Sequence, residues 1–162
     1  MIRDATARDA AGIAAIWNPV IRDTSITFNS AEKTEADIAG LIADRQAAGH
    51  AFLLAEEAGR IAGFASYAQF RAGTGYGRTM EHTILLDPVA QGRGLGRALM
   101  RALEDHARAA GMTALIGGVS AENSAGRAFH ARMGFAEVAI LQRVGFKFGR
   151  TMDLVLMQKF LA

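Results

Sequence analysis

The chain of 162 residues has the length of a single domain. Hydrophobic residues make up 51% of the sequence and charged residues 21%, a composition that is typical of globular proteins and excludes a disordered chain. Cysteine is absent, which excludes disulfide bonds, a thiolate nucleophile and cysteine-ligated zinc.

The small net charge of +2 is unevenly distributed. Residues 1–50 carry 5 basic and 7 acidic side chains, whereas residues 51–162 carry 13 basic and 9 acidic ones. A nucleic-acid-binding protein is usually far more basic, so we expect no nucleic-acid partner. The modest C-terminal excess of positive charge suits a small anionic ligand better than a polymer.

Neither a membrane span nor an export signal is predicted. Uncharged runs such as Ala109–Ala121 fall short of the roughly 18 residues that a spanning helix needs. Arg3, Asp4, Arg8 and Asp9 lie where a signal peptide would have its apolar core. We therefore expect a cytoplasmic protein with no membrane partner.

The first half of the chain begins with two predicted helices. Apolar residues recur at helical spacing over Asp9–Ile21, with Asp9 as the expected N-cap. A second helix is predicted over Thr34–Ala48 and ends at Gly49. The segment Arg22–Lys33 between them is predicted to be a loop.

Strands are predicted next, followed by the clearest helix of the sequence. Three strands are expected over Ala51–Glu56, Ile61–Phe70 and Thr79–Leu86. Gly94–Ala110 places its apolar residues on one face, which is typical of an amphipathic helix.

The remaining predicted elements are a buried strand, a helix and two further strands: Ala114–Val119, Ser124–Met133, Ala136–Leu141 and Thr151–Gln158. The order is roughly βααβββαβαββ, which predicts one mixed α/β domain over residues 1–162.

A glycine-rich turn joins the predicted strand ending at Leu86 to the helix starting at Gly94. Gly92, Gly94 and Gly96 permit positive φ and close backbone approach to a ligand. The unpaired N–H groups and the positive dipole end of the helix then favour an anion such as phosphate. The loop lacks the Lys-Ser/Thr of a nucleotide-hydrolysing P-loop and the G-x-G-x-x-G spacing of a dinucleotide site. A plain structural turn is the alternative interpretation.

Two segments resemble signatures of the GNAT superfamily of N-acyltransferases. Gln91–Gly96 resembles the Q/R-x-x-G-x-G/A loop that binds the acyl-CoA diphosphate, and Asn123–Phe135 resembles the second signature, an Asn followed by a helix ending in Gly-Phe. Tyr76–His82 and Val144–Asp153 narrow the resemblance to the phosphinothricin acetyltransferase family, as do Trp17-Asn18 and Thr27-Phe28. The resemblance spans nearly the whole chain. It departs from the family pattern at Gly126, often Ser, and at Thr151, often Trp.

This resemblance implies a GNAT fold, in which helices flank both faces of a mixed, mostly antiparallel central sheet. It implies acetyl-CoA as the donor, no metal, and a small amino-acid-like acceptor such as phosphinothricin, methionine sulfoximine or methionine sulfone. It also implies a homodimer. The residues that it assigns to acetyl-CoA are Ile84, Leu85, Leu86, Gln91, Gly92, Arg93, Gly94, Leu95, Gly96, Arg97, Asn123 and Arg127.

Catalysis by direct attack of the acceptor amine in a ternary complex is the expected mechanism. The chain has no cysteine and no G-x-S-x-G turn with which to form an acyl-enzyme. Glu81 is the candidate general base, because a partly buried carboxylate near the thioester would have a raised pKa; an ion pair with Arg78 is the alternative. His130 is the candidate acid for the leaving thiolate, as the resemblance implies, and packing is the alternative.

The resemblance also places Phe28, Tyr76 and Lys147 on the acceptor side. Phe28 could equally belong to the core, and Lys147 to a solvated turn. Arg78 is a candidate for binding the acceptor carboxylate as a bidentate pair.

Two further residues have alternatives of their own. Asn123 suits either the coenzyme amides or a helix N-cap. His82 directly follows Glu81, so on a regular strand the two side chains point to opposite faces. A bulge expected by analogy would turn one of them and make His82 a pocket residue. His50 and His106 are interpreted as structural.

Two other functions remain open at this stage: acetylation of a protein N-terminus or peptide amine, and acyl-CoA binding by a non-catalytic regulator. The Arg22–Asn29 loop and Arg78 would close around a free carboxylate in the case of a small acceptor. They would leave an open groove in the case of a peptide.

Overall fold

A computed structural model describes all residues, 1–162, and confirms the GNAT fold. The strands are β1 Ile2–Asp4, β2 Phe52–Glu57, β3 Arg60–Gln69, β4 Thr79–Leu86, β5 Ala114–Ser120, β6 Ala136–Lys147 and β7 Arg150–Phe160. The helices are α1 Ala10–Asp23, α2 Glu35–Ala47, α3 Leu95–Ala109 and α4 Ser124–Arg132, with short 3₁₀ turns over Ala7–Asp9, Thr74–Tyr76 and Pro88–Ala90.

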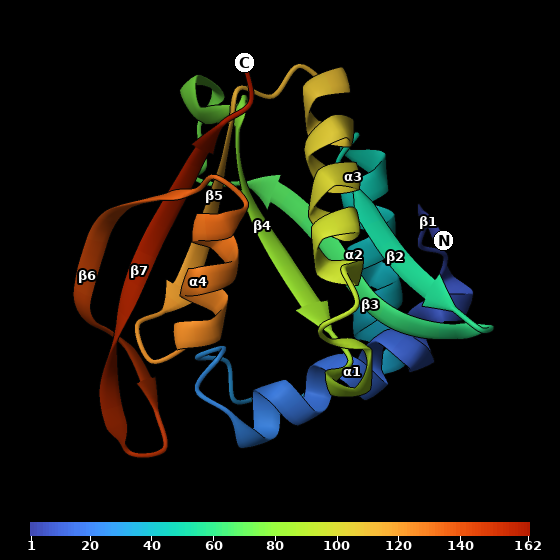
Figure 1. The fold of residues 1–162 in the computed structure, drawn as a ribbon, viewed down its shortest axis with the longest axis horizontal. Helices are drawn as coiled ribbons and strands as arrows, with labels where there is room; N and C mark the ends of the chain where they lie inside the picture. The colour runs from blue at the N-terminus through green and yellow to red at the C-terminus, as the bar shows by residue number, and fades with distance from the viewer.

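One seven-stranded sheet, in the order β1-β2-β3-β4-β5-β7-β6, forms the centre of the molecule. Only the β4–β5 pair is parallel, so the predicted mixed and mostly antiparallel sheet is confirmed. In Figure 1, α3 and α4 lie in front of the sheet and α2 lies behind it. No helix is long and apolar enough to span a bilayer.

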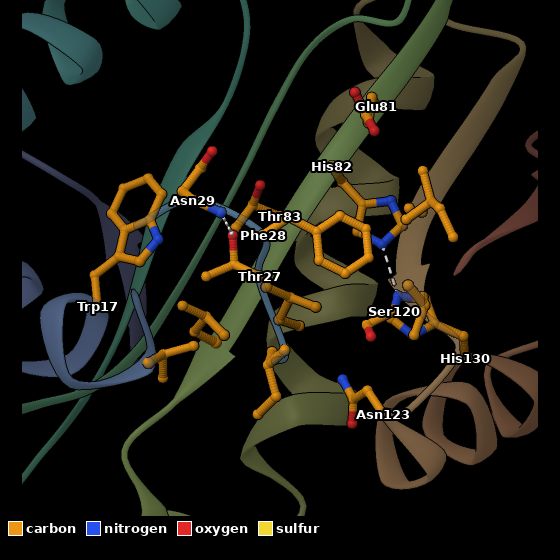
Figure 2. A pocket seen from close by; sticks show the side chains of 18 residues that line it. Trp17, Thr27, Phe28, Asn29, Glu81, His82, Thr83, Ser120, Asn123 and His130 are labelled. Atoms are coloured by element: carbon orange, nitrogen blue, oxygen red, sulfur yellow. Dashed lines mark hydrogen bonds between the residues drawn. The ribbon is translucent and has the colours of Figure 1, made fainter. Parts of the chain in front are cut away.

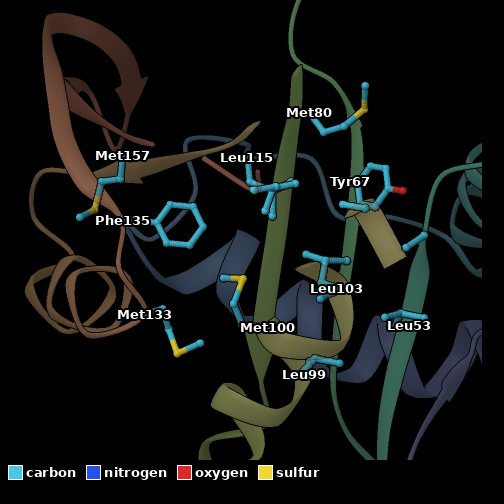
Figure 3. Close-up of a cluster of buried hydrophobic side chains, with 14 of the residues drawn as sticks. Leu53, Tyr67, Met80, Leu99, Met100, Leu103, Leu115, Met133, Phe135 and Met157 are labelled. Atoms are coloured by element: carbon cyan, nitrogen blue, oxygen red, sulfur yellow. The ribbon is translucent and has the colours of Figure 1, made fainter. Parts of the chain in front are cut away.

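Alternation of side chains along the strands separates two apolar cores. Leu53 and Tyr67 face α3 and join the larger core with Leu99, Met100 and Leu103 (Figure 3). The intervening residues of β2 and β3 face the opposite side, where Phe52, Leu54 and Phe64 pack against α1 and α2. Helices therefore cover both faces, as the resemblance implied.

The register between β4 and its neighbours opens the sheet. β4 pairs with β3 along its whole length, from Gln69↔Met80 to Gly63↔Leu86. With β5 it pairs only from Thr79↔Ala114 to His82↔Gly117. Beyond His82 the two strands part, because β5 continues along β7 while β4 runs toward the glycine-rich turn.

Two local predictions need correction. Asp9 stands at the N-cap position of α1, but its side chain does not cap that helix. Its carboxylate instead accepts hydrogen bonds from the backbone N–H of Thr6 at 2.7 Å and from the Arg3 guanidinium at 2.8 and 3.0 Å. The two bonds from the Arg3 guanidinium and the bond from Thr6 engage both oxygens of the carboxylate, which turns it away from the first turn of α1.

The predicted strand Ala136–Leu141 is too short, since β6 continues to Lys147. β6 is the edge strand, and its large apolar side chains such as Val138, Ile140 and Phe146 are exposed. Register shifts at Glu137/Ala139 and between Leu141 and Gly145 interrupt the alternation that identifies a strand from sequence.

Candidate active site

A cavity of about 300 Å³ occupies the region where β4 and β5 part (Figure 2). Its walls come from α1, the loop after α1, β4, β5, the start of α4 and β7. Side chains from both faces of the sheet line it, including Glu81 and His82. The bulge expected in β4 is absent, because its register with β3 is regular. Glu81 and His82 line the same cavity because β4 and β5 separate there, and not because β4 contains a bulge.

Glu81 lies on the sheet face that also carries α1 and α2. An ideal Cβ on Gly118 would come within 3.1 Å of Glu81 Oε2, so the carboxylate lies directly over this glycine of β5. Glu81 is open to the cavity, and partial desolvation by the protein around it raises the pKa of its carboxyl above the usual range. No ion pair joins Glu81 to Arg78, so the structural alternative for Glu81 is wrong.

His82 points to the opposite face and meets His130 of α4. Their Nε2 atoms lie 2.9 Å apart, and the rings are stacked with centroids 5.1 Å apart. His130 Nδ1 lies 2.7 Å from the carbonyl oxygen of Gly126. Burial lowers the pKa of His82 to about 3 and lowers that of His130 as well. Both imidazoles are therefore neutral at pH 7.

The loop after α1 contributes Phe28 and Thr27 to the cavity. Lys147 anchors this loop from β6: its Nζ donates to the carbonyl oxygens of Thr24 at 2.6 Å and Thr27 at 2.8 Å. With 4% of Lys147 exposed, the alternative of a solvated turn is wrong. The Phe28 ring packs on Gly145, where any Cβ would collide with it.

Asn123 lines the cavity and also caps α4, accepting a hydrogen bond from the backbone N–H of Gly126 at 2.9 Å. The N-cap interpretation is thus confirmed, and the amide remains within reach of a ligand in the cavity. A Cβ on Gly126 would collide with the Asn123 side chain, which explains why this chain has glycine at that position.

The glycine-rich turn borders a second hollow of about 280 Å³. Gly92 and Gly94 both have φ of +80°, and Gly94 is the N-cap of α3. Leu86, at the end of β4, lines this hollow, while Ile84 and Leu85 line the first cavity. The edge of β4 therefore runs from one hollow to the other.

This arrangement fits an acyl-CoA. The first N–H groups of α3 have no partners within the helix and lie beside Arg97 at the hollow. Each such N–H that bonds a charged phosphate oxygen contributes about 1.5–3 kcal/mol. The extended backbone of β4 leads from there to the cavity, so it can hold the pantetheine arm and leave the thioester near Glu81.

Several predicted coenzyme residues lie outside the second hollow. Arg93 forms an ion pair with Glu57 at 3.0 Å, and Arg127 forms two hydrogen bonds with Glu137. Gln91 and Leu95 do not line the hollow either. Their assignment to acetyl-CoA stays a prediction.

Sequence reasoning missed Arg132, at the end of α4, which lines the hollow opposite the glycine turn. No motif marks it, because its position depends on how α4 packs against α3. It also missed Ser120 in the first cavity, which follows the Gly117-Gly118 pair of β5. That pair of glycines in a buried strand was the available signal.

Tyr76 and Arg78 precede β4 and do not line either hollow. The carbonyl oxygen of Arg78 accepts a hydrogen bond from the backbone N–H of Thr113 at 2.8 Å, which fixes this end of the strand. Their assignment to the acceptor stays a prediction.

A mixed sheet that parts beside a glycine-rich helix start defines an acyl-CoA-dependent acyltransferase fold. The chain matches the Acetyltransferase (GNAT) family over residues 17–135. The protein belongs to this family and is an acetyltransferase.

Curated relatives extend over nearly the whole chain. The L-methionine sulfoximine/L-methionine sulfone acetyltransferase of Salmonella typhimurium is 35% identical over 97% of this chain and 92% of its own. The L-amino acid N-acyltransferase MnaT of Escherichia coli is 38% identical over 97% and 91%. The phosphinothricin N-acetyltransferase of Alcaligenes faecalis is 32% identical over 93% and 77%.

Solved structures share the whole fold. The acetyltransferase yncA of Salmonella typhimurium, solved with its cofactor acetyl-CoA, has a TM-score of 0.95 and 34% identity, covering 100% of this chain and 94% of its own. A ribosomal-protein-alanine N-acetyltransferase from Brucella melitensis has a TM-score of 0.95 and 35% identity, covering 99% of each chain.

Gly94→Ala is expected to weaken acetyl-CoA binding about tenfold or more, because a side chain at φ +80° strains the turn that presents the N–H groups. Calorimetric titration with acetyl-CoA measures this. Gly111→Ala is the matched control, since Gly111 has φ of +82°, equally open surroundings and a place at the other end of α3. Equal affinity in the two variants would contradict the assignment of the turn.

Lys147→Met is expected to release the loop after α1 and expose Trp17, the single tryptophan, which lines the same cavity. Acrylamide quenching of its fluorescence should increase. Lys159→Met is the control, because the half-buried ammonium of Lys159 also donates to a carbonyl, that of Met133, and pairs with Glu104, but it lies away from the loop. Increased quenching in both variants would indicate general loosening instead.

Proposed function

We propose that the enzyme transfers acetyl from acetyl-CoA to the α-amino group of a small amino-acid-like acceptor by direct attack in a ternary complex. The observation that carries this proposal is the unpaired carboxylate of Glu81, which lines a cavity connected along β4 to the glycine turn. The names of the relatives support phosphinothricin, methionine sulfoximine or methionine sulfone as the acceptor class.

Glu81 acts as the general base in this proposal. When bound, acetyl-CoA supplies the activated thioester, and the amine must lose a proton before it can attack. A carboxylate with a raised pKa accepts that proton more readily than one with an ordinary pKa. The loop after α1, held by Lys147, covers the acceptor side of the cavity and excludes water.

His130 is the proposed source of the proton for the leaving sulfur. Glu81 takes the first proton, before the nitrogen attacks. Because burial keeps its imidazole neutral, His130 can protonate the sulfur only after it has taken the second proton, the one that the nitrogen still carries once it has bonded to the thioester carbon. The carbonyl of Gly126 would stabilise the resulting charge, since it already accepts from His130 Nδ1.

No arginine or lysine lines the cavity, so the acceptor carboxylate needs a cation from its surroundings. We propose Arg78 for this role, with Tyr76 beside it, because its guanidinium forms no ion pair or hydrogen bond within the chain. An acceptor reaching Arg78 would lie along β4 past Glu81.

Acetylation of a protein N-terminus is the second candidate, favoured by the likeness to the Brucella melitensis structure. A peptide needs an open groove, whereas Lys147 holds the loop after α1 against the cavity. That closure favours a small acceptor. A non-catalytic regulator is disfavoured because the Glu81 carboxylate lines the cavity and forms no ion pair within the chain.

We also propose a cytoplasmic homodimer. The edge strand β6 exposes Val138, Ile140, Val144 and Phe146, an apolar surface of the kind that subunit contacts cover.

An acceptor screen with acetyl-CoA tests the small-molecule proposal. Released thiol is measured with phosphinothricin, methionine sulfoximine, methionine sulfone and the common amino acids, and with peptides that begin with alanine. Turnover of a free amino-acid analogue with little turnover of peptides is the expected result. Turnover confined to the peptides would replace the proposal with the second candidate.

Glu81→Gln is expected to lower kcat by about 10²–10⁴-fold, because the amide cannot accept a proton. Acetyl-CoA affinity should stay unchanged. Since the pKa of Glu81 is raised, the wild-type rate should fall with decreasing pH at values above the ordinary carboxyl range, and the variant should lose this limb. A variant with near-normal turnover would remove Glu81 from the mechanism.

A further inference from the structure

The hydrogen bond between His82 and His130 has a defined direction. Their Nε2 atoms lie 2.9 Å apart and both rings are buried, so one nitrogen donates and the other accepts. The neutral state of both rings leaves one N–H on each. Either ring could be the donor in an isolated pair, and a third group decides between them.

The carbonyl of Gly126 is that third group. It lies 2.7 Å from His130 Nδ1, and a carbonyl oxygen only accepts, so His130 carries its proton on Nδ1. His130 Nε2 is therefore unprotonated and accepts from His82 Nε2–H. His82 Nδ1 is left as a buried acceptor with no partner in the chain.

The surroundings fix both rings in this arrangement. Gly117 lies beneath them: a Cβ there would come within 3.0 Å of His82 Cε1 and 3.2 Å of His130 Nε2. Phe135 packs on both rings with centroids 5.2 Å away. Glu81 is the one acidic residue that lines the cavity, and it lies on the other face of the sheet over Gly118. On the far side of Phe135 the ammonium of Lys159, paired with Glu104, lies 5.9 Å from the ring centroid.

We propose that His82 is a positioning residue for acetyl transfer, which holds His130 in the Nδ1–H form with the lone pair of Nε2 occupied. In the resting enzyme His130 then has no free N–H and no free lone pair. Any proton exchange by His130 requires the bond to His82 to open or shift, so the two rings act as one unit. This inference rests on the function proposed above.

The tautomers are measured directly by NMR of enzyme labelled with ¹⁵N at its 4 histidines. His130 should show the Nδ1–H form and His82 the Nε2–H form. This measurement needs no substrate and no substitution. A His130 protonated on Nε2 would overturn the proposal.

The kinetics of two variants of His82 test whether its hydrogen bond to His130 supports acetyl transfer. His82→Leu removes the donor and should lower kcat about tenfold or more, with KM for acetyl-CoA unchanged. His82→Gln places an amide N–H near the position of Nε2 and should restore most of kcat. Gly117→Ala should lower kcat as well, since its Cβ displaces the rings without removing a donor.

His106→Leu is the control, because it removes another histidine hydrogen bond, that to the Tyr67 hydroxyl at 2.8 Å, outside both hollows. Its kcat should match the wild type. Equal kcat in His82→Leu and wild type, or equal loss in His82→Leu and His82→Gln, would overturn the proposal. A wild-type enzyme inactive on every acceptor would instead refute the proposed function, and the NMR result would stand independently.

Discussion

The early end of the β4–β5 pairing is the constraint on which the rest of the site depends. A parallel pair that stops at His82↔Gly117 leaves backbone groups of β4 without partners on that side. Unpaired backbone groups in a buried strand are costly unless something bonds them. The free edge of β4 runs between the two hollows, so a ligand that supplies amides along it would satisfy these groups. The opening thus creates both the space for the acyl donor and the reason for the strand to hold it.

The opening also places acid–base groups on both faces of one sheet. Glu81 and His82 are adjacent in sequence, yet one lies over Gly118 and the other beside Gly117. Partial desolvation raises the pKa of the Glu81 carboxyl and burial lowers the pKa of both imidazoles, so each group is shifted toward its neutral form. A cavity with these properties favours an amine in its uncharged, nucleophilic form.

Local patterns predicted the elements that carry the donor site. The glycine turn and the helix after it follow from positive-φ glycines and an apolar stripe, both visible within a short window. Contacts between distant segments could not be predicted this way. Lys147 donates a hydrogen bond to the carbonyl of Thr24, which lies 123 residues earlier in the chain. Arg132 lines the second hollow only because of the way α4 packs in the fold. The full length of β6 could not be predicted either, because its register shifts depend on its pairing with β7, which comes later in the chain.

Three glycines near the cavity occupy positions where a neighbouring side chain leaves no room for a Cβ. Gly117, Gly126 and Gly145 each leave room for a specific neighbour: the histidine pair, Asn123 and Phe28. Gly126 is also one of the two positions at which the chain departs from the pattern of the phosphinothricin acetyltransferase family, which often has serine there. With a Cβ at that position the Asn123 side chain could not fold back over the start of α4 as it does here. The departure therefore alters how the amide of Asn123 meets the cavity, while the carbonyl of Gly126 still directs the tautomer of His130.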